Sequence, residues 1–370
     1  MMDNRTRREV LAATGTATIG AIGLAGCTSN SRSGNSGNGS LTSNNGSGTS
    51  SGSEKLDHLT IANATHFGNM QHYVMQEHGA YDDITNDLTI KNFTSGPKIV
   101  KAFVSGSVDI AYFGISPTFV IHDKANKGTI PVASTRNGLR VMSIDSFADL
   151  YKQKKGNAFS AFETKHGRKL RVASAPEGSV PDVILRYWIE KDLGLGDTDS
   201  VIQKKRVPPE KTAQAMEAGE VDATMIHEPF ATVLNNTSGF TQAEWSGNIL
   251  DGHPVKVVFV NDKVFSNKPA VTNLVKSHVE ATKFIQDNPK KAAMAAVEHM
   301  GTDIEKSLAI KAMKSPAMNF VSDPRAVKSQ SLAMAKYVDS VGKTSSVIEP
   351  DEVFDTSIYD SVATQTTSTQ

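Results

Sequence analysis

The chain has 370 residues, of which 38% are hydrophobic and 21% charged, so most of it has enough apolar material for ordinary globular cores. Its 39 lysines and arginines balance its 39 aspartates and glutamates, and a chain without a basic excess is not a dedicated nucleic-acid binder. The single cysteine, Cys27, excludes an internal disulfide and any metal site built from several cysteines.

The N-terminus has the pattern of an export signal. Arg7 and Arg8 precede a mildly apolar segment that is too short and too rich in Gly and Thr to span a membrane. The paired arginines resemble the twin-arginine signal, and Leu-Ala-Gly-Cys at 24–27 resembles a lipobox, whose cysteine becomes the lipidated mature N-terminus. We therefore predict a signal peptide over 1–26 and a lipid on Cys27, against the alternative of a buried cysteine in an apolar segment.

A polar tract follows the predicted lipidation site. Residues 28–53 are almost only Ser, Gly, Asn and Thr and cannot bury enough surface to offset their chain entropy. We expect a flexible linker, which together with Cys27 covers 27–54. A lipid and a linker predict an extracytoplasmic domain anchored at the outer face of the cytoplasmic membrane.

The region after the linker begins with strand, helix and strand patterns. Residues 59–62 and 87–91 have the composition of strands. A helix is expected to begin at Gly96-Pro97, because proline suits a first helical position, and to end at Gly106. A third strand is expected to follow at once over 108–113.

The helix-glycine-strand pattern occurs twice. Ala-x-x-x-Gly-x-Val-Asp at 102–109 recurs at 215–222, and each copy leads through a strand to a proline turn, at 114–117 and at 227–230. A single repeat of this length can arise by chance. The alternative is that the chain has two lobes of similar α/β architecture. Ligands of open α/β sheets bind beyond the carboxyl ends of the strands, where both proline turns lie.

A third turn of this kind covers 175–181, between a strand expected at 170–173 and a helix expected over 182–193. Gly178 and Ser179 at the start of that helix offer backbone N–H groups and a hydroxyl to an anion. The alternative for Ser179, as for Ser116 in the first proline turn, is a helix cap with nothing bound.

Motifs for catalysis and for nucleotide or metal binding are missing. The sequence has no Gly-x-Gly-x-x-Gly, Walker loop, His-Glu-x-x-His or Gly-x-Ser-x-Gly, and its 10 histidines are scattered. We therefore expect no catalytic residues, no metal and no other cofactor.

The ordered series of segments resembles the substrate-binding proteins of ABC importers for nitrate, sulfonates, taurine and related small molecules. The segments that carry the resemblance follow the family's order over most of 57–360; they are 96–109, 149–150, 175–179, 215–222, 228–230 and 281–289. The resemblance implies the type II periplasmic-binding-protein fold, with two α/β lobes around a ligand cleft.

The resemblance also implies where the lobes divide. Lobe one is expected over 55–137 and 254–370, and lobe two over 138–253. Residues 151–167 depart from the family pattern and are expected to be an insertion that decorates lobe two.

A set of ligand-binding residues is carried over from the family onto the matching positions. They are His66, Phe67, Gly96, Gly114, Ser116, Pro117, Arg136, Glu177, Gly178, Ser179, His227 and Glu228. The serines and histidines would donate to an oxyanion, and Arg136 would pair with a negative ligand unless it is a surface charge at the hinge. The carboxylate of Glu228 instead suits an amine or a pyrimidine, so the substrate class stays open at this stage.

The resemblance implies a monomeric receptor without enzymatic activity, which captures a small molecule and delivers it to an ABC permease with its ATPase. An anion like nitrate, a sulfonate or taurine is the favoured ligand. One alternative is uptake of a thiamine-precursor pyrimidine or an amine. A second is an enzyme like the thiamine-pyrimidine synthases, whose cysteine-rich active-site motif this chain lacks. A third is a ligand-sensing partner of a signalling receptor, which would share every feature of the sequence.

Overall fold

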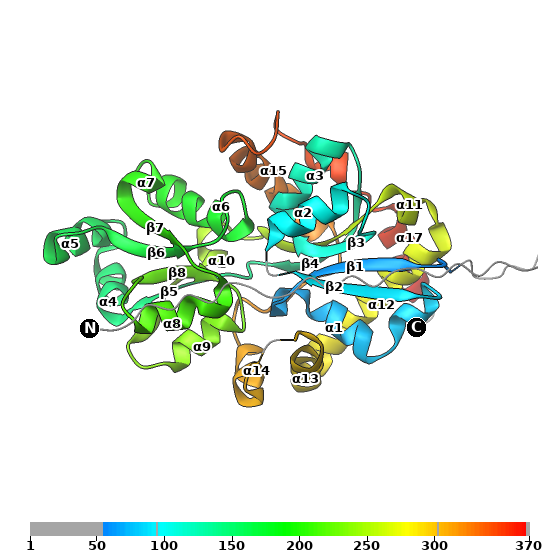
Figure 1. Ribbon diagram of the computed structural model, residues 1–370, viewed down its shortest axis with the longest axis horizontal. Helices are drawn as coiled ribbons and strands as arrows, with labels where there is room; N and C mark the ends of the chain where they lie inside the picture. The colour runs from blue at the N-terminus through cyan, green and yellow to red at the C-terminus, as the bar shows by residue number, and fades with distance from the viewer. Residues whose placement is uncertain (1–54, 94, 302, 368–370) are drawn as a thin grey trace, which may run out of the picture. The chain divides into compact units, whose positions relative to one another are not determined.

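Two mixed β-sheets, each covered by helices, make up the described part of the chain in this computed structural model (Figure 1). The structure describes residues 55–93, 95–301 and 303–367, and residues 52–370 form one unit. The predicted signal peptide with Arg7 and Arg8, and the predicted linker with Cys27 up to residue 54, lie outside the described residues.

The first sheet has six strands in the order β11-β4-β10-β3-β1-β2. Strands β1, β2 and β3 are parallel, whereas β10 runs antiparallel to both β3 and β4. The bounds are β1 Leu59–Ala64, β2 Leu88–Phe93, β3 Ile110–Gly114, β4 Thr129–Arg136, β10 Pro254–Val260 and β11 Asn319–Phe320.

The second sheet has five strands in the order β7-β6-β8-β5-β9. Strands β6, β7 and β8 are parallel, and β5 runs antiparallel to β8 and β9. The bounds are β5 Arg140–Ile144, β6 Leu170–Ser174, β7 Ile202–Arg206, β8 Ala223–Ile226 and β9 Phe240–Trp245.

Both sheets share one plan. In each, three parallel strands lie in the order second, first, third, and the third strand pairs with an antiparallel strand, β10 or β5. The repeated segments take equivalent places, because 102–109 leads into β3 and 215–222 leads into β8. Gly106 and Gly219 both adopt a positive φ, of 74° and 65°, which ends the preceding helix. The predicted pair of similar α/β lobes is confirmed.

Helices cover both faces of each sheet (Figure 1). Those that follow strands of the first sheet up to β4 are η1 Phe67–Asn69, α1 Met70–Glu77, η2 Ala80–Asp83, α2 Gly96–Val104 and α3 Ile115–Ala125. The middle of the chain adds α4 Asp145–Lys154, α5 Asn157–His166, α6 Val180–Tyr187, a π-helical turn at Trp188–Asp192, α7 Thr198–Val201, η4 Pro209–Lys211, α8 Thr212–Glu217, α9 Phe230–Asn236 and α10 Ser246–Ile249. The C-terminal part adds α11 Asp262–Ser266, α12 Lys268–Asp287, α13 Pro289–His299, α14 Lys306–Ala312, α15 Arg325–Ser340, α16 Pro350–Val353 and α17 Ser357–Thr367. None of the helices in this described part is long and apolar enough to cross a membrane.

The predicted elements differ from the observed ones mainly at their ends. The strand expected at 108–113 begins at Ile110, and the helix expected at 182–193 begins at Val180 and turns π-helical at Trp188. The departure at 151–167 consists of the end of α4 and the whole of α5. This segment contributes to the packing of the second sheet's helices, since Phe159 packs edge-on against Trp188 of the neighbouring π turn.

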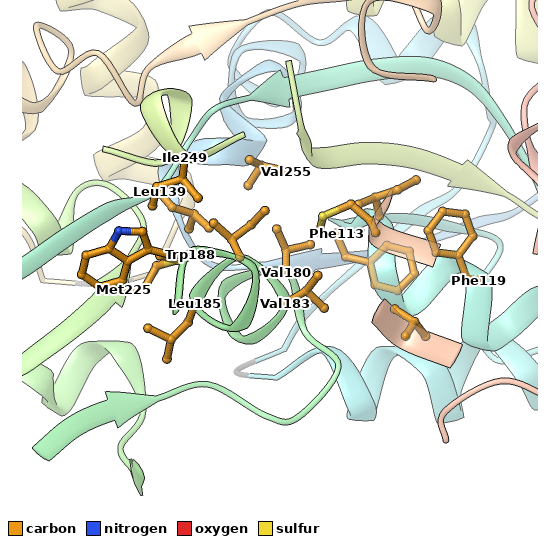
Figure 2. Close-up of a cluster of buried hydrophobic side chains, with 14 of the residues drawn as sticks. Phe113, Phe119, Leu139, Val180, Val183, Leu185, Trp188, Met225, Ile249 and Val255 are labelled. Carbon is orange, nitrogen blue, oxygen red and sulfur yellow. The ribbon is translucent and has the colours of Figure 1, made fainter. Parts of the chain in front are cut away.

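One hydrophobic cluster is shared by the two sheets. Figure 2 shows it running from Phe113 and Phe119 beside the first sheet, through Val180 and Val183 of α6, to Trp188 beside the second. We propose the lobe boundaries expected from the sequence, because β4 passes to β5 across 137–139 and the chain returns at the start of β10. The shared cluster means that the lobes are packed together in this structure.

Candidate ligand-binding site

A cavity of about 300 Å³ lies between the two sheets. The last residue of each of the six parallel strands lines it: Ala64, Phe93 and Gly114 from the first sheet, and Ser174, Arg206 and Ile226 from the second. Carboxyl ends of parallel strands are where open α/β sheets bind ligands, because the following turns and helix N-termini present free backbone donors there. The cavity is therefore the candidate site.

Half of the predicted ligand-binding residues line this cavity and half do not. The lining includes His66, Gly96, Gly114, Pro117, Ser179 and His227. It does not include Phe67, Ser116, Arg136, Glu177, Gly178 and Glu228. The cavity thus brings together predicted residues from turns after β1, β3, β6 and β8, which lie far apart in the sequence.

Lys256 is the residue that our sequence interpretation missed. It lies in β10, opposite Gly114 of β3 and Thr135 of β4, and lines the cavity although only 5% of its surface is exposed. No hydrogen bond or ion pair links its ammonium to any other described residue. Burial lowers the pKa of Lys256 to about 7. Its signal in the sequence is a single cation in the apolar run Pro-Val-Lys-Val-Val-Phe-Val, all of which is buried.

Two stacked histidines adjoin this lysine. The rings of His66, after β1, and His227, after β8, lie 4.5 Å apart between centroids and are almost parallel, at 6°. Burial, and then the charge of Lys256, hold the pKa of each histidine well below its usual value, so both rings are neutral at pH 7. Nδ1 of His66 and Nε2 of His227 are buried and have no hydrogen-bond partner within the described chain.

Two further residues contribute to the cavity or to the space around Lys256. The hydroxyl of Ser179, at the start of α6, is buried and lacks a partner among the described residues. Gly68 leaves room for the lysine, because a Cβ at that position would lie 3.0 Å from Cγ of Lys256. Unpaired buried polar groups are costly, so this set of donors is suited to an acceptor-rich ligand.

The carboxylate of Glu228 is already used within the protein. Its Oε1 accepts from Nη1 of Arg140 at 2.9 Å and its Oε2 accepts from the backbone N–H of Thr232 at 2.9 Å, while only 1% of the residue is exposed. It does not line the cavity. The preference for an amine or pyrimidine that we inferred from this carboxylate therefore has no support in the geometry.

The other predicted residues outside the lining have different surroundings. Phe67 is fully buried in the core beneath the first sheet. Ser116 is fully buried in the first turn of α3, and Arg136 ends β4. Glu177 makes an ion pair with Lys343 beside Gly178. Their direct contact with a ligand stays a prediction.

Removing the charge of Glu228 should destabilise the fold. Glu228→Gln leaves the buried Arg140 guanidinium without its anionic partner, so we expect a loss of about 3 kcal/mol in the free energy of unfolding, measured by urea denaturation. Glu220→Gln is the matched control, because Glu220 pairs with Lys205 at the surface and should change stability little. Equal losses of unfolding free energy in the two variants would show that the buried pair contributes no more to stability than the surface pair.

No group of three or more His, Cys, Asp or Glu side chains in the described ranges is arranged to hold a metal ion. The donors in the lining include the ammonium of Lys256, two neutral imidazoles, a hydroxyl and the exposed cations of Lys98 and Arg206, and the acidic residue in the lining, Glu210, is exposed. This arrangement is suited to binding an anion rather than a cation.

Two solved structures of binding proteins have a similar fold. The nitrate-binding protein NrtA from Synechocystis is 16% identical, with a TM-score of 0.71 over 84% of this chain and 89% of that chain. The alkanesulfonate-binding protein SsuA from Xanthomonas axonopodis pv. citri, bound to MOPS, is 14% identical, with a TM-score of 0.64 over 81% of this chain and 99% of that one. The fold is that of the type II periplasmic binding proteins, as the sequence predicted.

The chain belongs to the NMT1-like family, whose model matches residues 52–299. Among curated proteins it is similar to the nitrate import ATP-binding protein NrtC of Synechocystis, 25% identical over 187 residues, or 46% of this chain. The match spans only 26% of that longer protein. A putative binding protein of Brucella abortus is 23% identical over 243 residues, which are 65% of this chain and 70% of that protein.

Proposed function

We propose that this protein is the substrate-binding component of an ABC importer and that it captures a small anion of the nitrate, sulfonate or taurine type between its two lobes. The observation that carries the proposal is Lys256, a buried lysine with no ion-pair partner among the described residues, in the lining of a cavity that both sheets share. An anion bound there would relieve the desolvation cost of the lysine and accept hydrogen bonds from His66, His227 and Ser179.

Binding in such a cavity would stabilise the closed arrangement of the lobes. His66 and Gly114 come from the first sheet, whereas Ser179 and His227 come from the second. A ligand that contacts both sets gains interactions that an open arrangement lacks, so it shifts the population toward closure. The backbone N–H of Phe67 donates across the same boundary to the carbonyl of Glu228 at 3.0 Å.

The cavity leaves room for an organic part of the ligand. Its volume of about 300 Å³ is at the lower end of the range for pockets that bind organic molecules, and inorganic anions are much smaller. Part of the wall is apolar. It includes the rings of Phe93, Pro117, Pro176, Pro208 and Phe230. A sulfonate with a short organic chain therefore fits the lining better than a bare ion.

We also propose the localisation and partners that the sequence suggests. Arg7 and Arg8 would direct export, a lipid on Cys27 would anchor the protein at the outer face of the cytoplasmic membrane, and a monomer would deliver ligand to a permease with its ATPase. The NMT1-like family and the binding proteins of the same fold support this assignment over an enzyme. A ligand-sensing partner of a receptor would use the same cavity.

A panel of ligands tests the proposed function. The full chain in detergent is heated with nitrate, bicarbonate, taurine, alkanesulfonates, thiamine pyrimidines and amines in turn. A true ligand at about 100 times its dissociation constant should stabilise the fold by about 2.7 kcal/mol, a shift of several degrees. We expect the anions to stabilise and the amines and pyrimidines to have no effect; stabilisation by an amine or a pyrimidine alone, or by none of the panel, would contradict the proposal.

The lipid anchor has its own test. Cys27→Ser should abolish lipidation, so the protein should leave the membrane fraction and lose the mass of the lipid in mass spectrometry. Because the change leaves the residues that line the cavity as they are, the ligand panel should be unaffected and serves as the control. Membrane retention equal to that of the unmodified chain would remove the lipoprotein assignment.

A further inference from the structure

The turn between β6 and α6 forms part of the cavity wall, but one of its side chains points elsewhere. Ala175, Pro176 and Ser179 line the cavity, whereas Glu177 does not. Oε2 of Glu177 instead lies 2.9 Å from Nζ of Lys343, beyond the end of α15. The family resemblance suggested Glu177 as a ligand contact, and the geometry gives its carboxylate a different partner.

Lys343 is held by the first lobe. Its backbone N–H donates to the carbonyl of Val338 at 3.1 Å, and the nearby N–H of Ser345 donates to Oδ1 of Asp123 in α3 at 2.8 Å. Because α3 follows β3 directly, the segment 341–345 is fixed to the lobe that contains the first sheet. The Glu177–Lys343 pair therefore joins a cavity turn of lobe two to lobe one.

The stem of Lys343 also covers this turn. A Cβ at position 178 would lie 3.0 Å from Cγ of Lys343, and Gly178 has a φ of 77°, which other residues rarely adopt. Glycine at 178 thus allows both the turn and the close approach of the lysine. The contact is steric as well as electrostatic.

On its other side the same turn is fixed to lobe two. The N–H of Gly178 donates to Oδ2 of Asp182 at 2.9 Å, and Arg186 lies 3.4 Å from Asp182 and 3.5 Å from Glu177. Asp182 is only 1% exposed, so these contacts hold the turn rigidly on the N-terminus of α6. A contact that holds Glu177 in place therefore also holds the rest of the turn 175–179, including Ser179.

We propose that Glu177 and Lys343 are positioning residues: their interlobe ion pair holds the turn 175–179 closed over the cavity and slows release of the bound ligand. This inference rests on the proposed function of the cavity, but the pair itself need not touch the ligand. Its two side chains are 51% and 38% exposed, so the pair is open to solvent and its effect should depend on salt.

The first experiment needs no ligand. Hydrogen exchange of the peptide that contains 175–180 is measured by mass spectrometry on the full chain and on Lys343→Ala at low salt. We expect exchange of this peptide to become about twofold to fivefold faster, and the difference to become smaller in 1 M NaCl, where only the packing of the lysine stem still distinguishes the two proteins. Lys205→Ala is the matched control, because Lys205 pairs with Glu220 within lobe two and should leave the peptide unchanged.

Changes of charge at position 343 separate pairing from mere packing. Lys343→Arg keeps the cation and should keep exchange slow, whereas Lys343→Glu should be faster than Lys343→Ala because two carboxylates then meet. A Lys343→Glu protein no faster than Lys343→Ala, or no effect of Lys343→Ala, would overturn the proposal.

The second experiment measures release directly with nitrate and methanesulfonate as probes. Lys343→Ala should raise the dissociation rate of whichever probe binds by about twofold to fivefold and leave the association rate unchanged. Binding with an unchanged dissociation rate would refute the role of the Glu177–Lys343 pair in ligand release but leave the proposed function intact. Failure of both probes to bind wild-type protein would instead refute the proposed function, and with it the release part of this inference.

Discussion

Lys256→Met is expected to abolish anion binding and at the same time to stabilise the empty protein. Loss of a buried charged partner commonly costs 2–5 kcal/mol of binding, so we expect affinity for the best anion to fall by at least about thirtyfold. Burial lowers the pKa of Lys256 from 10.5 to about 7, which means that folding works against the charged form of this side chain. Methionine removes that cost, on the order of 1–4 kcal/mol near neutral pH, while keeping a similar length.

Titration calorimetry measures the first effect and urea denaturation of the ligand-free chain measures the second. Lys98→Met is the matched control, since Lys98 also lines the cavity but is exposed. It should change stability little and affinity much less than Lys256→Met. A Lys256→Met protein that binds the anion as wild type does, or that is less stable, would contradict the role we give to this lysine.

Affinity for a non-titrating anion such as nitrate should fall as the pH rises above 7. Binding requires the ammonium form of Lys256, whose pKa in the folded, empty protein is about 7. Below pH 7 this form predominates and affinity should be constant; above it, each unit of pH should weaken binding about tenfold, because a proton must be taken up with the anion. His66 and His227 do not alter this window, since burial keeps their pKa values well below 6.5.

The stability of the empty protein should change in the opposite direction. The pKa of Lys256 is lower in the folded than in the unfolded chain, so the unfolded chain binds more protons between about pH 7 and 10.5. The contribution of this group to stability should therefore increase as the pH rises through that range and be lost as the pH falls back to 7.

Calorimetry at pH 6, 7, 8 and 9 at constant ionic strength checks the predicted pH dependence of anion binding. An affinity that is the same at pH 6 and pH 9 would show that the lysine does not supply the charge.

Much of the cavity was predictable because local sequence determines where strands end. The apolar runs of β1, β3, β6 and β8 identify strands, and the glycine and proline turns that follow identify their carboxyl ends. Such ends meet at one edge of each sheet, and the family resemblance, which implies a cleft between two lobes, placed His66, Gly114, Ser179 and His227 near one ligand.

The remaining parts of the site depend on pairing between distant segments. Lys256 reaches the cavity because β10 inserts between β3 and β4, and nothing local to residues 254–260 specifies those neighbours. Arg140 neutralises Glu228 because β5 pairs antiparallel with β8, so the carboxylate could be counted as free only while that register was unknown. Glu177 likewise has its partner at Lys343, in a different lobe.

The measurement that tests the central claim most directly is a crystal structure of the chain with the anion that stabilises it most in the ligand panel. We predict that an oxygen of the anion lies within hydrogen-bond distance of Nζ of Lys256, with His66 and His227 donating beside it and both sheets in contact with the ligand. An anion bound outside this cavity, with Lys256 still buried and unpaired, would contradict the account.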